Sequence, residues 1–497
     1  MYKYINLALI FGVSLFVATA HATDVFTPTP RTPGITIDTD SSDNIASFDM
    51  PQTEGGAITY YVHYSLPSGW SLNSGTQNVF YIDRSSYRGG AFYHPSSDVY
   101  GGFIRNTASN NGGAMYIGTG TSVTGDFINN AAYGDGGGAL NMTYNSRANN
   151  LIDGLFINNQ GDNDSGGGAI NGWIPNINAI RGDFIGNWGS GGGAILFFGN
   201  TGSSVSSTGS LASIEGNFVV NRAVYEGGAI NIGVPVGRIS NSLFYGNTAG
   251  TYGGAIINHV VGVGTIGTIS DSAFYNNSAG QYGGAIYNAG TIGNITNSVF
   301  YGNKMTTAND NLGGGAIYNT GTITNITADF LYNSSVWDAG AVFNSGTIGR
   351  IVGNFEHNSA KYAGAFYNSG GGTVTITGNF LYNSASSHSG AIFNYGTVSN
   401  KTSTLNLLAD TQDMTFYGNT DPTEYNDINN TRYSSTPVIN MNAATGRKIS
   451  FGGTVRGSEG ALNLNNDSSA DNRGGQYVFN NTVSGNSFNL YNFGQFC

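Results

Sequence analysis

The sequence contains one cysteine, Cys497, which is also its last residue. A disulfide within the chain is therefore impossible, and the fold must be held together by its own hydrogen bonds and core. The terminal thiol could cross-link two chains, but a thiol at the end of a chain is more often inert. We therefore assign Cys497 no role.

Charged residues are also scarce, at 9% of the chain, and the 29 Asp and Glu outnumber the 18 Lys and Arg. The resulting formal net charge of −11 at pH 7 argues against nucleic acid and anionic lipid as partners, because both are bound by clustered Lys and Arg. With so few charges, the surface must be polar through Asn, Ser, Thr and Gly. Such a surface suits a protein that works outside the cell.

Long hydrophobic runs are absent after the N-terminus, so no transmembrane helix is expected. The one apolar run, from Ile5 to Ala20, follows Lys3 and ends in Ala20-His21-Ala22. A basic residue, a short apolar run and small residues at a cleavage site are typical of a secretory signal peptide. Residues 1–22 are therefore predicted to be a signal peptide, and the mature protein to lie at the cell surface or in the extracellular space.

Two motifs recur through the remaining sequence in a fixed phase. A Gly-Ala step returns every 23 to 35 residues, and a Phe-x-x-Asn motif lies between successive steps. The repeated alanines are Ala57, Ala91, Ala114, Ala139, Ala169, Ala194, Ala229, Ala255, Ala285, Ala316, Ala341, Ala365 and Ala391. Self-similarity of this kind indicates a solenoid rather than several separate domains.

The best-formed repeat reads GGAIYNAGTIGNITNSVFYGN, from Gly283 to Asn303. Its short runs of Ile, Val, Thr, Tyr and Phe, broken by Gly and Asn, are typical of strands and tight corners. We predict an all-β fold over residues 55–420, a single-stranded parallel β-helix of about 13 coils, with the right-handed sense usual for parallel crossovers. Residues 23–54 are expected to form a lead-in and N-terminal cap, and residues 421–497 a C-terminal cap of irregular β-structure.

Each motif has an expected structural role. Paired glycines allow a positive φ and close backbone approach at a corner, Phe fills the core, and Asn adopts the left-handed conformation of a corner while its side chain bonds along the rod. A further asparagine column, three residues after the alanine, is expected to be a ladder rather than a carbohydrate-binding row. The predicted structural positions include Phe244, Asn247, Ala255, Phe274, Asn277, Ala285, Asn288, Phe330, Asn333, Ala341 and Asn344.

Few residues suggest chemistry. Glycoside hydrolysis uses a pair of carboxylates, and the candidates are Asp38, Asp40, Asp43, Asp162, Asp164, Asp421 and Glu424. Asn419-Thr420-Asp421 matches one short motif of polygalacturonases, but the motifs that should accompany it are missing. The acidic segments 38–43 and 161–168 are expected to be solvated loops rather than calcium sites, and the histidines at 63, 94, 259, 357 and 388 lack metal-ligand spacing. We therefore predict no catalytic residue, no metal and no cofactor.

The Gly-Gly-Ala-Ile and Phe-x-x-Asn repeats behind a signal peptide resemble the repeats of polymorphic outer membrane proteins, which are found in autotransporter passengers. The resemblance covers roughly residues 55–420, and the tail from Thr482 to Gly494 is similar to the end of such a passenger. It implies an exported, β-helical adhesin. It also implies an outer-membrane translocation barrel as a partner if the native chain continues beyond Cys497.

The expected function is thus that of a non-enzymatic, adhesin-like rod that binds a host or surface ligand, protein or glycan. Recognition is expected at exposed tyrosines and at the insertions Gly199–Ser213 and Lys304–Asn311. The tyrosines could equally well be stacked along the rod for structural reasons. A secreted carbohydrate lyase or hydrolase on the same fold is the alternative function.

Overall fold

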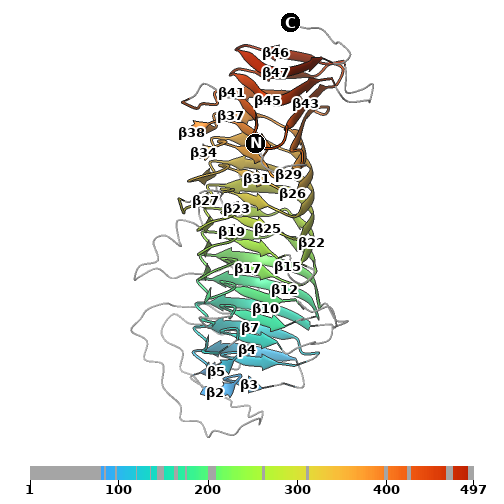
Figure 1. Ribbon diagram of the computed structural model, residues 1–497. Helices are drawn as coiled ribbons and strands as arrows, with labels where there is room; N and C mark the ends of the chain where they lie inside the picture. The colour runs from blue at the N-terminus through green and yellow to red at the C-terminus, as the bar shows by residue number, and fades with distance from the viewer. Residues whose placement is uncertain are drawn as a thin grey trace, which may run out of the picture.

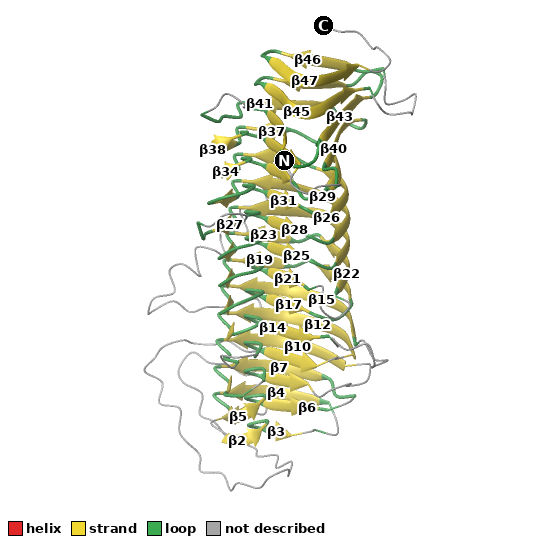
Figure 2. Ribbon diagram, viewed as in Figure 1, coloured by secondary structure: helices red, strands yellow, loops and turns green. Residues whose placement is uncertain are grey.

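The computed structural model describes residues 80–490, apart from 83–84, 94, 96–97, 119, 135, 143–149, 162–165, 174–175, 200–208, 260–263, 309–312, 397–400, 423–426 and 466–473. This part of the chain is an elongated parallel β-solenoid of about 12 turns without a helix (Figures 1 and 2). The predicted all-β, parallel β-helix architecture is therefore confirmed. The predicted signal peptide, the lead-in and the repeat around Ala57 lie outside the described residues.

The strands of the successive turns form three faces. The first, which we call the Ala-Ile face, begins directly after each Gly-Ala step. Its strands are β3 (Phe92–Tyr93), β6 (Met115–Ile117), β9 (Leu140–Met142), β11 (Ile170–Trp173), β14 (Ile195–Phe198), β17 (Ile230–Ile232), β21 (Ile256–Asn258), β25 (Ile286–Asn288), β28 (Ile317–Asn319), β31 (Val342–Asn344), β35 (Phe366–Asn368), β39 (Ile392–Gly396), β42 (Ile428–Arg432), β45 (Val455–Leu464) and β47 (Val483–Leu490).

The second, the long-strand face, follows in each turn and carries the Phe-x-x-Asn motif. Its strands are β1 (Phe80–Ile82), β4 (Val99–Ile104), β7 (Val123–Ile128), β10 (Asn150–Ile157), β12 (Asn176–Ile185), β15 (Ser210–Val219), β18 (Val236–Ser240), β19 (Leu243–Tyr245), β22 (Thr265–Ser270), β23 (Ala273–Tyr275), β26 (Thr291–Tyr301), β29 (Thr322–Leu331), β32 (Thr347–Val352), β33 (Phe355–Glu356), β36 (Thr373–Thr377), β37 (Phe380–Leu381), β40 (Thr404–Ala409), β41 (Met414–Tyr417), β43 (Val438–Ala443), β44 (Lys448–Phe451) and β46 (Gln476–Phe479).

The third, the short-strand face, precedes the next Gly-Ala step, and its later strands run along the left edge of Figure 1. It consists of β2 (Ser85–Arg88), β5 (Thr107–Asn111), β8 (Ala131–Ala132), β13 (Trp188–Gly189), β16 (Arg222–Ala223), β20 (Thr248–Ala249), β24 (Ser278–Ala279), β27 (Lys304–Met305), β30 (Ser334–Ser335), β34 (Ser359–Tyr362) and β38 (Ser384–His388). All three faces are built from parallel pairs between successive turns.

The core is a column of phenylalanines, as predicted. Neighbouring rings in the column stack with centroids 4.6 to 5.1 Å apart. The side chains of Phe244, Phe274 and Phe300 are completely buried, as are the repeated alanines from Ala114 to Ala391 and the isoleucines that follow them, such as Ile286. Burial of each such phenylalanine stabilises the fold by about 1.5–3 kcal/mol.

The asparagines of Phe-x-x-Asn form a continuous buried ladder. Asn247 donates from Nδ2 to Oδ1 of Asn277 in the next turn (2.9 Å) and to the backbone oxygen of Phe218 in the previous one (2.8 Å). Its backbone N–H also donates to Asn277 Oδ1 (3.0 Å). The predicted ladder is therefore confirmed.

The predicted left-handed conformation of these asparagines is wrong, because it belongs to the residue before each of them. Those residues have φ between 47° and 67°, as at Val220, Asn276 and Tyr332. The left-handed residue turns the chain at the corner, and this turn directs the following asparagine into the interior. The second asparagine column is also a ladder: Asn288 Nδ2 donates to Asn319 Oδ1 at 2.7 Å, and both side chains are fully buried.

The paired glycines have the two predicted uses, one at each position. Gly283 has a φ of +64°, whereas a Cβ on Gly284 would lie 2.0 Å from the backbone oxygen of Gly315 in the next turn. The first glycine therefore provides the left-handed turn, and the second allows the backbones to approach closely.

Parallel stacking continues through the segment expected to be an irregular cap. On the Ala-Ile face, β39 pairs with β42, β42 with β45 and β45 with β47, all in parallel. The phenylalanine column also continues to Phe451 and Phe479. The asparagine ladder ends earlier, where Asn419 Nδ2 donates to Oδ1 of Asp427 (2.9 Å). Beyond Asn419 the core phenylalanine of each turn is kept, but the asparagine of the Phe-x-x-Asn motif is not. The solenoid therefore extends further along the chain than the sequence motif.

Candidate functional site

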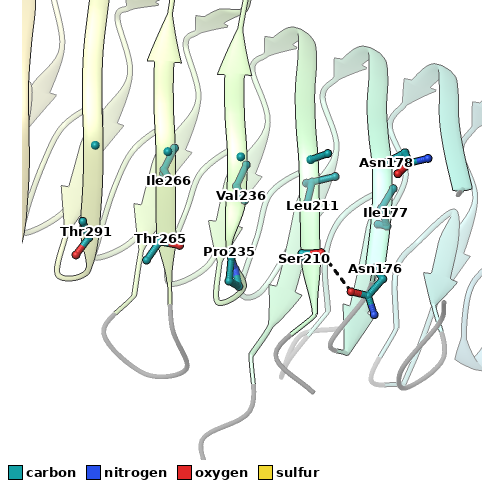
Figure 3. Close-up of a pocket in the computed structure, with 14 residues that line it drawn as sticks. Asn176, Ile177, Asn178, Ser210, Leu211, Pro235, Val236, Thr265, Ile266 and Thr291 are labelled. Carbon is teal, nitrogen blue, oxygen red and sulfur yellow. Dashed lines mark hydrogen bonds between the residues drawn. The ribbon is translucent and has the colours of Figure 1, made fainter. Parts of the chain in front are cut away.

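Two hollows on the surface of the described solenoid are candidates, and the first is a trough across five turns of the long-strand face (Figure 3). Its volume is about 520 Å³. Gly237, Gly267 and Gly293 form its floor, where the preceding turn lies too close for a side chain: a Cβ on Gly267 would be 2.4 Å from the backbone oxygen of Gly237. Ser210 on the rim donates from Oγ to Asn176 Oδ1 (3.2 Å). The residues that line the trough are uncharged and include no aromatic ring.

The second hollow, which we call the aromatic cleft, lies between the short-strand face at β34 and β38 and the Ala-Ile face at β35 and β39. Its volume is about 630 Å³. It combines aromatic rings with charged and hydrogen-bonding groups. The lining residues are Trp337, Asp338, Lys361, Tyr362, Tyr367, His388, Phe393, Tyr395, Asn429, Thr431 and Arg456.

One wall of the cleft is formed by the second residue of each strand of the Ala-Ile face. Because side chains alternate along a strand, Ile392 and Asn394 point into the core while Phe393 and Tyr395 point outward. Parallel register places equivalent outward residues one above another through seven turns. This outward column reads Tyr287, Tyr318, Phe343, Tyr367, Phe393, Asn429 and Arg456.

The rings of this column stack on each other until they reach the cleft. Tyr318 and Phe343 are nearly parallel, with centroids 4.5 Å apart, and Phe343 and Tyr367 are 5.2 Å apart at 21°. Between Tyr367 and Phe393 the rings turn to 78°, an edge-to-face contact. Phe343, Tyr367 and Phe393 are almost fully buried in an apolar cluster of their own, separate from the main core. The wall is therefore rigid, and the regular stacking ends within the cleft.

The opposite wall comes from the residues just before each Gly-Ala step. Bridges and strand register align Asp338, Tyr362 and His388 in three successive turns. The ammonium of Lys361 lies 3.2 Å from the centroid of Trp337 and 5.0 Å from that of Tyr362. Cation–π contacts of this kind fix the position of the ammonium. The ammonium of Lys361 is therefore fixed in position at the cleft.

Two of the cleft tyrosines, Tyr367 and Tyr395, stay protonated at neutral pH. Burial, and after it the charge of Asp338, raise the pKa of Tyr367 well above its ordinary value. Burial likewise raises the pKa of Tyr395, with a smaller contribution from Tyr433. A neutral phenol can both donate and accept a hydrogen bond. The tyrosines are thus suited to hydrogen bonding with a ligand and not to acting as bases.

A second row of exposed aromatic rings runs along the long-strand face. Tyr332, His357 and Tyr382 stack with centroids 4.8 and 5.2 Å apart, and all three have φ of 54° or 55°. Such backbone angles are unusual for bulky residues. The rings cover one another's faces, whereas the aromatic cleft combines rings with charged groups around a hollow, so the cleft is the better candidate site.

The predicted chemistry-bearing residues are dispersed. Asn419 belongs to the buried ladder, and Asp421 Oδ2 accepts a hydrogen bond from the backbone N–H of Ser389 (2.5 Å). His259 Nε2 lies 2.7 Å from Glu226 Oε2, His357 is exposed as expected, and His388 lines the cleft. Candidates outside the described residues are Asp38, Asp40, Asp43, His63, His94, Asp162, Asp164 and Glu424.

Other features bear on metals, membranes and the predicted insertions. Among the described residues no three His, Cys, Asp or Glu side chains gather closely enough to hold a metal ion. In the same part of the chain, no helix has the length and hydropathy needed to span a membrane. The insertions Gly199–Ser213 and Lys304–Asn311 lie partly outside the described residues.

Sequence reasoning missed the aromatic cleft. The sequence does contain a signal for the outward column: in five consecutive repeats, from Tyr287 to Phe393, the second residue after the repeated alanine is aromatic. Trp337, Lys361 and Arg456 belong to segments without a repeated motif, so no pattern joined them to that column.

In comparisons with known proteins, no protein-family model, no curated protein and no solved structure matches this chain.

Proposed function

We propose that this protein is an exported, adhesin-like rod that binds a ligand at the aromatic cleft. The observation that carries the proposal is a preformed hollow in which held aromatic rings, a held ammonium and neutral phenols face the same space. Binding sites typically combine apolar and aromatic walls with a few placed polar groups. The stacked turns beneath the cleft keep those groups in position.

Export through a signal peptide and display as the passenger of an autotransporter-type protein are part of the same proposal. The Gly-Gly-Ala-Ile and Phe-x-x-Asn repeats support it through their resemblance to the polymorphic outer membrane protein repeats. About 12 turns at about 4.8 Å per turn give a rod of roughly 60 Å, long enough to hold a binding cleft away from a surface. Export can be measured by sequencing the N-terminus of the secreted chain, which is expected to start at Thr23.

The alternative, a carbohydrate-active enzyme, would use the same cleft. Hydrolysis of a glycosidic bond uses two carboxyl groups, and the described lining of the cleft contains one, Asp338. Cleavage is therefore an outcome to be measured alongside binding.

The experiment is to immobilise the full-length mature protein and probe it with an array of glycans and extracellular proteins. Trp337→Ala removes a wall of the cleft. Trp173→Ala, which removes a tryptophan that is 48% exposed on β11, is the matched control. We expect ligands that bind the wild type and Trp173→Ala but lose at least about tenfold in affinity with Trp337→Ala. Equal binding by all three proteins would refute the cleft as the site, and mass spectrometry of recovered glycans would reveal any cleavage.

A further inference from the structure

We propose that the ligand class of the aromatic cleft is an acidic saccharide, a short stretch of sugar rings that carry carboxylate or sulfate groups. The inference rests on the binding function proposed above and specifies its ligand. Three observations support it: the local charge, the arrangement of the rings and the polar groups between them.

The cleft carries positive charge on a chain that is negative overall. Lys361 and Arg456 both line it, against one carboxylate, Asp338, whereas the whole chain has a net charge of −11. A guanidinium is suited to paired hydrogen bonds with a carboxylate or sulfate, and a held ammonium to a single strong one. Charge complementarity therefore favours an anionic ligand in this cleft.

The rings of the cleft indicate more than a simple anion. Tyr367 and Phe393 are almost fully buried, but Trp337, Tyr362 and Tyr395 are only partly buried and present ring surface to the hollow. A sugar ring has an apolar face of C–H groups and a polar rim, so it can lie against an aromatic surface while its hydroxyls bond sideways. Free phosphate has no apolar face and would gain nothing from these walls.

The polar groups lie where a sugar rim would need them. Tyr395 and Thr431 are half-buried at the side of the hollow, and Asn429 continues the outward column directly after Phe393. These groups both donate and accept hydrogen bonds, as sugar hydroxyls do. A volume of about 630 Å³ falls within the range of about 300–1,000 Å³ usual for small-ligand sites, which suits a few sugar rings.

The test is isothermal titration calorimetry of the full-length mature protein with two probes of equal length. One is a linear trisaccharide of galacturonic acid, and the other is the neutral trisaccharide of galactose with the same linkage. We expect the acidic probe to bind at least about tenfold more tightly than the neutral one, with a preference that falls as salt is added. Trp337 fluorescence should change with the acidic probe, because the Lys361 ammonium lies against its ring.

Variants at the two cations separate charge recognition from folding. Lys361→Met and Arg456→Gln should each reduce the acid preference at least about threefold. The matched controls Lys304→Met and Arg222→Gln, at exposed positions of β27 and β16, should leave it unchanged. Thermal unfolding followed by circular dichroism identifies any variant that does not fold.

The outcomes distinguish this inference from the proposed function. Equal affinity for both probes overturns the acidic class while the binding function stands. No binding of either probe, with an array ligand that still depends on Trp337, also overturns the acidic class alone. No binding of either probe and no array ligand that depends on Trp337 overturns both.

Discussion

Removal of one asparagine from the buried ladder provides the sharpest test of how the rod is held together. In Asn277→Ala the side chain that links three turns is lost. Asn277 Nδ2 donates to Asn303 Oδ1 (3.0 Å) and to the backbone oxygen of Phe244 (2.9 Å), while Asn277 Oδ1 accepts from the backbone N–H and from Nδ2 of Asn247. All of these groups are buried, so water cannot replace the lost partners.

The expected cost follows from what stays unpaired. The Nδ2 of Asn247 keeps its bond to the Phe218 oxygen, and Asn303 Oδ1 keeps the one from the backbone N–H of Asn277. The backbone N–H of Asn247 loses the acceptor it has in the wild type. One unsatisfied buried donor costs about 1–3 kcal/mol, and the other lost bonds about 1 kcal/mol each. Three other bonds are lost, so we expect a loss of about 4–6 kcal/mol in the free energy of unfolding.

Asn325→Ala is the matched control. Its Nδ2 donates to Asn294 Oδ1 (3.0 Å) between the same kinds of turns, but on the exposed surface, where water can replace the partner. The expected cost is below about 0.5 kcal/mol. Urea denaturation measures both variants, and hydrogen exchange should show faster opening in peptides around Asn247 for Asn277→Ala alone. Equal costs for the two variants would show that the buried ladder does not stabilise the rod.

Three further predictions concern substitutions at single positions of the rod. Burial raises the pKa of Asp126 from 3.8 to about 6, so the ionised carboxylate destabilises the folded protein above that pH. In urea denaturation, the free energy of unfolding of Asp126→Asn should exceed that of the wild type by up to about 3 kcal/mol at pH 8 and should equal it at pH 4. Phe274→Ala should lose about 3–5 kcal/mol by the same assay, because it breaks the core column, and a loss below about 1 kcal/mol would contradict that role. Gly284→Ala should prevent folding or lower the melting temperature sharply, whereas Gly446→Ala, with no atom within 4 Å of the added Cβ, should cost only about 1 kcal/mol.

Features that recur in every turn could be predicted from the sequence. The core phenylalanines, the buried alanines and both asparagine ladders follow from stacking, because an identical position in each turn must meet its own equivalent. A residue such as Asn277 was therefore assigned its ladder correctly. Its backbone conformation was not predicted, because the left-handed position before it is filled by Gly, Asn, Arg, Val, Tyr or His and so shows no single-residue pattern.

Features that occur once could not be predicted in the same way. In the segment 421–490 the core position persists at Phe451, but its Asn partner is missing, and parallel pairing continues without the motif. The aromatic cleft depends on Trp337, Lys361 and Arg456, which come from different turns and share no spacing. Only the register of the turns brings these residues together.

Hydrogen exchange of the full-length protein, with and without a ligand found on the array, tests the binding cleft most directly. When the ligand is bound, exchange should slow in the peptides that contain Trp337, Lys361–Tyr367 and His388–Tyr395. Exchange around Trp173 on β11, several turns away from the cleft, should not change. Protection confined to the trough around Gly267, or to the exposed row around Tyr332, would contradict the assignment of the aromatic cleft as the binding site.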